Sequence, residues 1–237
     1  MNWWDQVWQR VVPGSSGGLA HSEALIALAA AVAVVVVPPV WRVVRVAVTL
    51  VHELGHAMIG VLFGRRFTGF VVNADMSGHA ITVGPDRGIG RIATTWAGYP
   101  APAVVGAGLC AGVADGYAAG MLTGMLLVLL FSLIRVRSLL TAVVTLAAGA
   151  GLGALWWYRD DQLQASVLLA VGGFLIIGAW RQLGAVIGSR DPHSDPAQLG
   201  ARTFLPRGFW LASFVVVVAA ATLLAGWLVI GAELTAS

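Results

Sequence analysis

The sequence predicts an all-α integral membrane protein with about seven transmembrane helices, in one domain that covers residues 1–237. Two observations lead to this fold class. Apolar residues make up 58% of the chain and charged residues only 11%, whereas soluble domains have about 45–50% and about 25%. Apolar runs also recur along the whole chain, and each is long enough to cross a hydrocarbon core of about 30 Å. These runs leave room for only one domain.

The predicted spans follow from the seven apolar runs in order. They lie at about 23–41, 43–63, 94–112, 119–135, 138–157, 163–184 and 209–232. Ahead of them, residues 1–22 place Trp4, Val7, Trp8 and Val11 on one helical face, which is typical of a short helix lying in the membrane interface. Ordinary aromatic belt residues would give the same pattern.

Glycines in two of the later spans predict close helix packing. Gly116, Gly120 and Gly124 form a ladder with a spacing of four residues, and the run at 138–157 contains Gly149, Gly151 and Gly153. Small residues let two helix backbones approach closely in a membrane. We therefore expect close backbone contacts at both places.

The second span contains the sequence His52-Glu-Leu-Gly-His56. On a helix, His52 and His56 lie on one face and can both bind a tetrahedral Zn²⁺, while Glu53 lies close enough to accept a proton from an attacking water. Glu53 is also the only charged residue between Arg45 and Arg65. An ionisable residue at membrane depth costs about 2.5–3.5 kcal/mol, so the cluster indicates a metal site. The alternative is a polar cluster that only ties helices together.

The arginines predict how the chain is oriented. All 14 basic residues are Arg, which with the excess of Ala, Val and Gly is typical of a bacterial protein. In the seven-span arrangement eleven of them fall on one side and three on the other. Positive residues favour the cytoplasmic side, so we expect a multi-pass protein of the inner (plasma) membrane with a cytoplasmic N-terminus and a C-terminus outside. Nothing in the pattern favours nucleic-acid binding.

Two polar segments, 64–93 and 188–207, fall on this cytoplasmic side, where the zinc site in the helix bundle would also lie. Within the first, two β-prone runs in residues 67–83 flank a turn at about Asp75 to Gly78 and predict a hairpin. An open strand edge beside a zinc site could hold a substrate in extended form. The hairpin residues expected to contact the substrate are Phe70, Val72, Asn73 and Asp75.

The segment 188–207 supplies the candidates for a third zinc ligand. Asp191, His193 and Asp195 lie within five residues of one another, and a carboxylate is a common ligand in hydrolytic zinc sites. We favour Asp195, with Asp191 and His193 as the alternatives. Asp195 could instead be the N-cap of a helix whose first residue is Pro196.

These residues carry a family resemblance over roughly residues 43 to 210. The His52-Glu-Leu-Gly-His56 sequence in an apolar span, the hairpin and the Asp-bearing motif resemble the site-2-protease group of intramembrane zinc metalloproteases. The small bacterial "B-like" branch is the most similar, through Asp75-x-x-Gly78, Ala97-Gly-Tyr-Pro-Ala-Pro102 and Ser194-Asp-Pro-Ala197. The resemblance implies that His52 and His56 bind Zn²⁺ together with an Asp and that Glu53 is the base.

The predicted function is therefore that of a zinc metalloendopeptidase that cleaves peptide bonds in or near the lipid bilayer. Its substrate would be a transmembrane or membrane-anchored protein, and its role regulated proteolysis. The alternative is a catalytically inactive protease-like scaffold that binds metal or a partner protein. A transporter or channel is a third class, which the absence of an evident inverted repeat makes less favoured.

Overall fold

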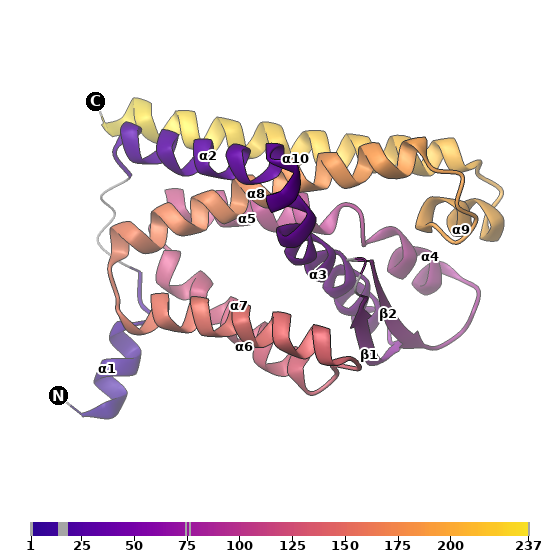
Figure 1. The fold of residues 1–237 in the computed structure, drawn as a ribbon, viewed down its shortest axis with the longest axis horizontal. Helices are drawn as coiled ribbons and strands as arrows, with labels where there is room; N and C mark the ends of the chain where they lie inside the picture. Colours follow the sequence, from indigo (N-terminus) through magenta and orange to yellow (C-terminus); the bar gives the residue numbers. More distant parts are fainter. Residues whose placement is uncertain (1, 14–18, 74, 76, 237) are drawn as a thin grey trace.

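The computed structural model describes residues 2–13, 19–73, 75 and 77–236. Most of the described chain is helical, with one two-stranded sheet (Figure 1). In chain order the elements are α1 (Trp3–Gln9), α2 (His21–Val36), α3 (Pro38–Leu62), β1 (Arg66–Val72), β2 (Gly78–Val83), α4 (Ile89–Trp96), α5 (Ala101–Ala114), α6 (Ala118–Leu133), α7 (Leu139–Trp157), α8 (Asp161–Gly188), α9 (Asp195–Arg202) and α10 (Arg207–Ala236).

The lengths of these helices fit a multi-pass membrane protein. In the described part of the chain, α3, α7, α8 and α10 are long and apolar enough to cross a membrane, and α4 with α5, bent by 67° between them, could form a fifth span. The apolar helices α2 and α6 have 16 residues each, which corresponds to only about 24 Å of helix. A count of seven spans therefore stays a prediction.

Two glycines allow α5 and α8 to approach closely. A methyl group added at Gly172 would lie 2.8 Å from the carbonyl oxygen of Gly106, so no larger residue fits where the two helices cross. In α7 the expected contacts do not form, because an added methyl group at Gly149, Gly151 or Gly153 would have nothing within 4 Å. Gly124 likewise has nothing within 4 Å, whereas a methyl group added at Gly120 would lie 3.4 Å from the Val11 carbonyl oxygen in the N-terminal segment.

The direction of α2 and α3 also differs from the prediction. α2 runs parallel to α8: Glu23 accepts a hydrogen bond from Gln162 near the start of α8, and the Val35 carbonyl accepts one from Arg181 further along it. After Val37 the chain does not turn back. Instead, α3 begins at Pro38 and leads further away from the N-terminal end (Figure 1). Two consecutive prolines cannot continue α2, and they start a new helix well.

As a consequence, the two ends of the chain lie at the same end of the bundle (Figure 1). The Nε of Arg10 donates to the Trp157 carbonyl at 3.2 Å, and Arg159 donates to the Val12 carbonyl at 3.3 Å. The N-terminal segment therefore touches the turn between α7 and α8, and the far end of α10 reaches the same end of the molecule. The two ends thus lie together because α2 and α3 do not form an antiparallel pair, which differs from the arrangement expected from seven alternating spans, and the sides of the membrane on which the termini lie stay a prediction.

The hairpin predicted within residues 67–83 is confirmed. β1 and β2 pair antiparallel, with Val72 opposite Gly78 and Arg66 opposite Val83. In the turn, the exposed Asp75 carboxylate accepts hydrogen bonds from the Ser77 hydroxyl and N–H, which lower the pKa of Asp75. Met76, within the predicted turn, lies outside the described residues.

Candidate active site

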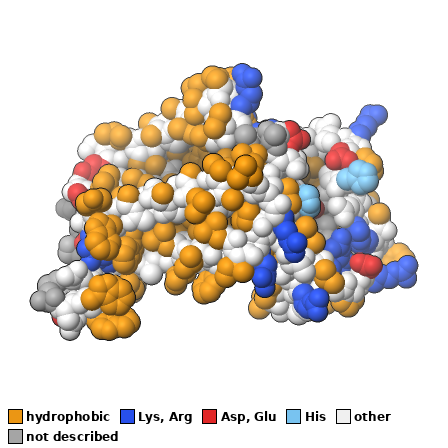
Figure 2. Space-filling view, turned by 60° about the horizontal axis from the view of Figure 1, so that its bottom comes forward, with side chains coloured by type: hydrophobic (Ala, Val, Ile, Leu, Met, Phe, Trp, Pro, Cys, Tyr) orange, Lys and Arg blue, Asp and Glu red, His pale blue; other side chains and the backbone are white. Residues whose placement is uncertain are grey.

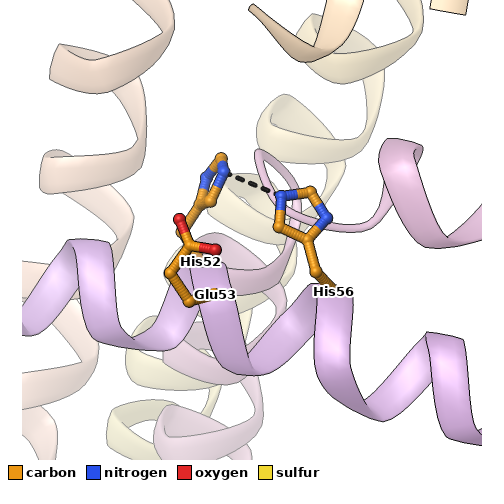
Figure 3. A group of neighbouring side chains, drawn as sticks. All are labelled: His52, Glu53 and His56. Carbon is orange, nitrogen blue, oxygen red and sulfur yellow. Dashed lines mark hydrogen bonds between the residues drawn. The ribbon is translucent and has the colours of Figure 1, made fainter. Parts of the chain in front are cut away.

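The two histidines of α3 lie on one face of the helix, as the sequence predicts (Figure 3). Their Nε2 atoms are 3.1 Å apart, and their rings meet edge to face. Glu53 lies beside them, and the metal-binding atoms of these three residues all fall within 4.8 Å of one another. The helix thus presents two imidazoles and one carboxylate to a single point.

A backbone carbonyl fixes the orientation of His56. Its Nδ1 lies 2.6 Å from the carbonyl oxygen of Thr94 in α4. Because a carbonyl oxygen can only accept, Nδ1 carries the hydrogen, and the lone pair of the neutral ring is then on Nε2. A second contact of this kind is how proteins orient metal-binding histidines.

The break between α4 and α5 lies directly against the histidine pair. A methyl group added at Gly98 would come within 2.6 Å of the His52 Nε2, so only glycine fits there. Next to it, the ring of Tyr99 meets the His52 ring edge to face at 4.8 Å and stacks on Phe214 at 5.3 Å. Sequence reasoning assigned no role to Gly98 or Tyr99, and the signal that could have marked them was their place in the Ala97-Gly-Tyr-Pro-Ala-Pro102 segment of the family resemblance.

Asp195 reaches the same point from the other end of the chain. Its Oδ2 lies 3.2 Å from the Nε2 of His52 and 3.2 Å from the Nε2 of His56. Burial of Asp195 alone would raise its pKa, but the two facing imidazoles outweigh this effect and hold the pKa of the carboxyl well below its usual range. Asp195 is thus oriented as a ligand of a cation between the three residues would be.

The alternative role of Asp195 as a helix cap does not match the structure. Ser194 occupies the N-cap position of α9, Asp195 is the first helical residue, and no side chain caps this helix. The neighbouring candidates line the cavity but are exposed. The Asp191 carboxylate accepts a hydrogen bond from the His193 N–H at 2.8 Å instead of facing the histidines.

The three facing atoms have the spacing that a zinc ion requires. Tetrahedral ligands about 2.0–2.1 Å from Zn²⁺ lie about 3.3 Å from one another, and the three separations here are 3.1, 3.2 and 3.2 Å. Two imidazole nitrogens with a carboxylate are also a usual donor set for hydrolytic zinc. The residues present therefore fit the ion.

Glu53 is held between this triad and the hairpin. Its side chain is buried, and among the described residues its Oε2 has no hydrogen-bond partner. β2 runs alongside: a methyl group added at Gly78 would lie 3.0 Å from the Glu53 Oε1, and the backbone N–H of Ala80 interacts with the carboxylate. A buried carboxylate with a free oxygen is suited to accept a proton.

The positions of Phe70 and Val72 do not fit the expectation that these residues contact a substrate. Both are buried, at 0% and 1% exposure, and the outer edge of β1 is covered by the turn between α6 and α7 together with the first turn of α7. The Phe70 N–H donates to the Arg135 carbonyl at 3.2 Å, and the Val72 N–H donates to the Thr141 hydroxyl at 2.8 Å. This edge is therefore closed, and these two side chains belong to the core.

The open edge of the hairpin belongs to β2. Phe70 and Val72 direct their backbone groups away from β2, so their partners Ala80 and Gly78 direct theirs away from β1. These outward groups lie on the side of Glu53. Of the other two expected contact residues, Asp75 lines the cavity, whereas the Asn73 side chain donates to the Ser77 hydroxyl at 3.0 Å.

A cavity of about 550 Å³ connects these parts, with walls from α3, α8, the hairpin turn and the segment before α9. His52, Glu53 and Asp195 all line it. Its volume falls within the range of small-ligand pockets. Two of the three candidate ligands and the candidate base therefore face one cavity inside the helix bundle.

The chain matches the family "Peptidase M50B-like" over residues 25–225, a range that includes α3, the hairpin and Asp195. No curated protein and no solved structure matches it. With most of its length covered by one family, the chain belongs to the M50B-like peptidases, a site-2-protease-like family of multi-pass membrane metalloproteases.

Proposed function

We propose that this protein is an intramembrane zinc metalloendopeptidase in which His52, His56 and Asp195 bind the metal and Glu53 is the general base. The observation that carries this proposal is the triangle of two Nε2 atoms and one Oδ2, each 3.1–3.2 Å from the next, beside a buried carboxylate. A scaffold without turnover would not need a buried base with an unpartnered oxygen.

Each residue has a distinct part in the reaction. Zn²⁺, when bound, supplies a Lewis acid that activates water and polarises a carbonyl. Glu53 accepts the proton of the attacking water and returns it to the leaving amide nitrogen. Thr94 and Gly98 keep the histidines in place, the first through its carbonyl and the second by leaving room.

The substrate of this reaction must be extended, because a helical peptide has its carbonyls bonded within the helix. The outer edge of β2 lies next to Glu53, and although the Ala80 N–H already contacts that carboxylate, the Ala80 carbonyl and the backbone groups of Gly78 can pair with such a strand. Strand addition of this type selects peptides that can unwind locally. We therefore propose membrane-anchored proteins with weak helical segments as substrates, cleaved in regulated proteolysis.

We also propose that the site opens toward the cytoplasm. Nine arginines lie in the segments at the end of the bundle that holds the hairpin and α9, and only Arg10 and Arg159 lie at the opposite end. Figure 2 agrees, with Arg side chains gathered at one end and apolar side chains over the rest. By the bias of positive residues, both ends of the chain then lie outside the cytoplasm.

Cysteine labelling in intact cells tests this orientation. The single Cys110 is buried, and in a Cys110→Ala background Gln6→Cys and Tyr158→Cys should react with an impermeant maleimide added outside, whereas Arg87→Cys should not. Labelling of Arg87→Cys but not of Tyr158→Cys would reverse the orientation. Opposite results for Gln6→Cys and Tyr158→Cys would contradict their placement at one end.

The activity is tested with Glu53→Gln in proteoliposomes that contain single-span test proteins with Gly-Pro pairs in their spans. The variant should keep about one zinc per chain and lose cleavage by about 10²–10⁴-fold, the usual contribution of a general base. Cleavage by Glu53→Gln at the wild-type rate would exclude Glu53 as the base. Zinc-loaded wild-type protein that cleaves none of these proteins would favour the scaffold.

A further inference from the structure

The cavity contains two positive charges that the hydrolytic site does not use. Arg45 from α3 and Arg181 from α8 both line it, on the same cavity as His52 and Glu53. Among the described residues neither guanidinium lies within ion-pair distance of a carboxylate. Both lie in helices that are long and apolar enough to cross a membrane, where a cation without a counter-charge is costly. Two of them facing one cavity indicate that an anion binds there.

The contacts of the two arginines hold them in place without neutralising them. Arg45 donates to the backbone carbonyl of Asp75, and its buried Nε has no partner among the described residues. Arg181 donates to the Val35 carbonyl and lies 4.8 Å above the ring of Trp41. The nearby Asp75 carboxylate is engaged by Ser77. Carbonyl oxygens and a ring face orient a guanidinium but leave its charge available.

The distance to the reactive centre sets what the anion can be. Arg45 is eight residues before Glu53 on the same helix, which is about 12 Å along the axis. An extended peptide advances about 3.3 Å per residue. A peptide whose scissile bond lies at Glu53 would therefore bring a side chain three or four residues away to the arginines.

The wall between the two ends of the cavity is polar as well. Gln182 lies one residue after Arg181, and its Nε2 contacts the Thr49 hydroxyl at 3.5 Å. Its buried Oε1 has no partner among the described residues. An unpartnered acceptor between the arginines and the catalytic residues suits a passing peptide N–H, whereas a lipid chain would leave it unsatisfied.

We propose that Arg45 and Arg181 form a specificity subsite that binds a substrate carboxylate three or four residues from the scissile bond. This inference rests on the proposed endopeptidase function, since it names the substrate class of the same cavity. Two charge-assisted hydrogen bonds to a guanidinium pair are strong enough to select an acidic residue over its neutral amide.

Binding to the inactive Glu53→Gln protein tests the subsite without turnover. The probes are two peptides that differ only in Glu or Gln at the third and fourth positions on either side of the cleavable bond. The Glu peptide should bind about tenfold more tightly, and Arg45→Gln and Arg181→Gln should each remove most of this difference, with Arg45→Lys restoring part of it. Arg42→Gln is the matched control, because Arg42 is exposed on α3 and does not line the cavity.

Three outcomes would overturn the subsite. Equal binding of the two peptides to the parent protein is the first, and an unchanged preference in both arginine variants is the second. The third is a response to lipid alone. If the protein binds phosphatidylglycerol vesicles more tightly than phosphatidylcholine vesicles, if the arginine variants abolish this difference, and if there is no preference for the Glu peptide, the arginine pair would be assigned to a lipid phosphate. A different result would separate the two proposals. If the wild-type protein binds zinc and prefers the Glu peptide but never cleaves any substrate, the subsite would stand and the endopeptidase function would be contradicted.

Discussion

Helices α3 and α7 are both long enough to cross a membrane, yet they differ in every feature that matters for function. α3 carries five ionisable residues and packs against the hairpin, α4, α5 and α8. α7 carries none, and only Thr141 and Thr145 in it are buried. Hydropathy places both helices in the membrane. What distinguishes the functional helix is the set of costly polar residues that it keeps there.

The glycines of the two helices show the same contrast. A methyl group at Gly55 of α3 would collide with Ala101 and approach the Ala97 carbonyl to 3.1 Å, because α5 begins at this point. The glycines of α7 face open space. A glycine in a span therefore identifies a close contact only where another element is known to lie opposite.

The largest expected difference between the two helices concerns the metal. His56→Ala and Asp195→Ala should each lose most of the bound zinc after dialysis against a chelator, because each removes one of three protein ligands. Metal analysis of the purified proteins measures this directly. Asp191→Ala and His193→Ala are the matched controls and should keep about one zinc per chain. Zinc retained in Asp195→Ala but lost in a control would move the third ligand to that neighbour.

Gly98→Ala should have the next largest effect. The added methyl group would lie 2.6 Å from the His52 Nε2, so the histidine must move, and a displacement of about 1 Å in a catalytic site can cost about 10²-fold in rate. The cleavage rate and the zinc content of the variant should both fall. Wild-type values for both would show that the break between α4 and α5 does not position the histidine pair.

Thr141→Val tests a buried hydrogen bond between α7 and the hairpin. The Thr141 hydroxyl accepts the buried Val72 N–H, and leaving that group unsatisfied should lower the free energy of unfolding by about 1–3 kcal/mol. Thr145→Val is the control, since its hydroxyl donates only to the Thr141 carbonyl within the same helix. Unfolding by denaturant in mixed micelles compares the two. Equal losses would mean that α7 does not anchor β1.

The smallest effect is expected for Gly149→Ala. Nothing lies within 4 Å of the new methyl group, and alanine is the better helix former by up to about 1 kcal/mol. The variant should be as stable as the parent or slightly more stable, with unchanged cleavage. A clear loss of stability would reveal a partner that packs on this face of α7.

Much of the fold could be predicted because the signals are local. The metal motif, the hairpin and the apolar runs are each contained in a few neighbouring residues. The direction of α3 could not be predicted, since the Val37-Pro38-Pro39 sequence ends a helix equally well before a reversal or a bend. The closed edge of β1 depends on Arg135 and Thr141, more than sixty residues away, and neither residue has a local pattern that marks it. The role of Asp195 as a ligand stays a prediction, although its position beside the histidines fits it.

The distance in sequence between α3 and α9 affects how the enzyme comes into existence. With Asp195 as the third ligand, the ligand set is completed by a residue synthesised about 140 positions after the histidines. A nascent chain in which α3 is already inserted therefore holds only two ligands, which bind zinc weakly. The protease would remain inactive until almost the whole chain has entered the membrane, so metal loading would act as a final check that the bundle has assembled.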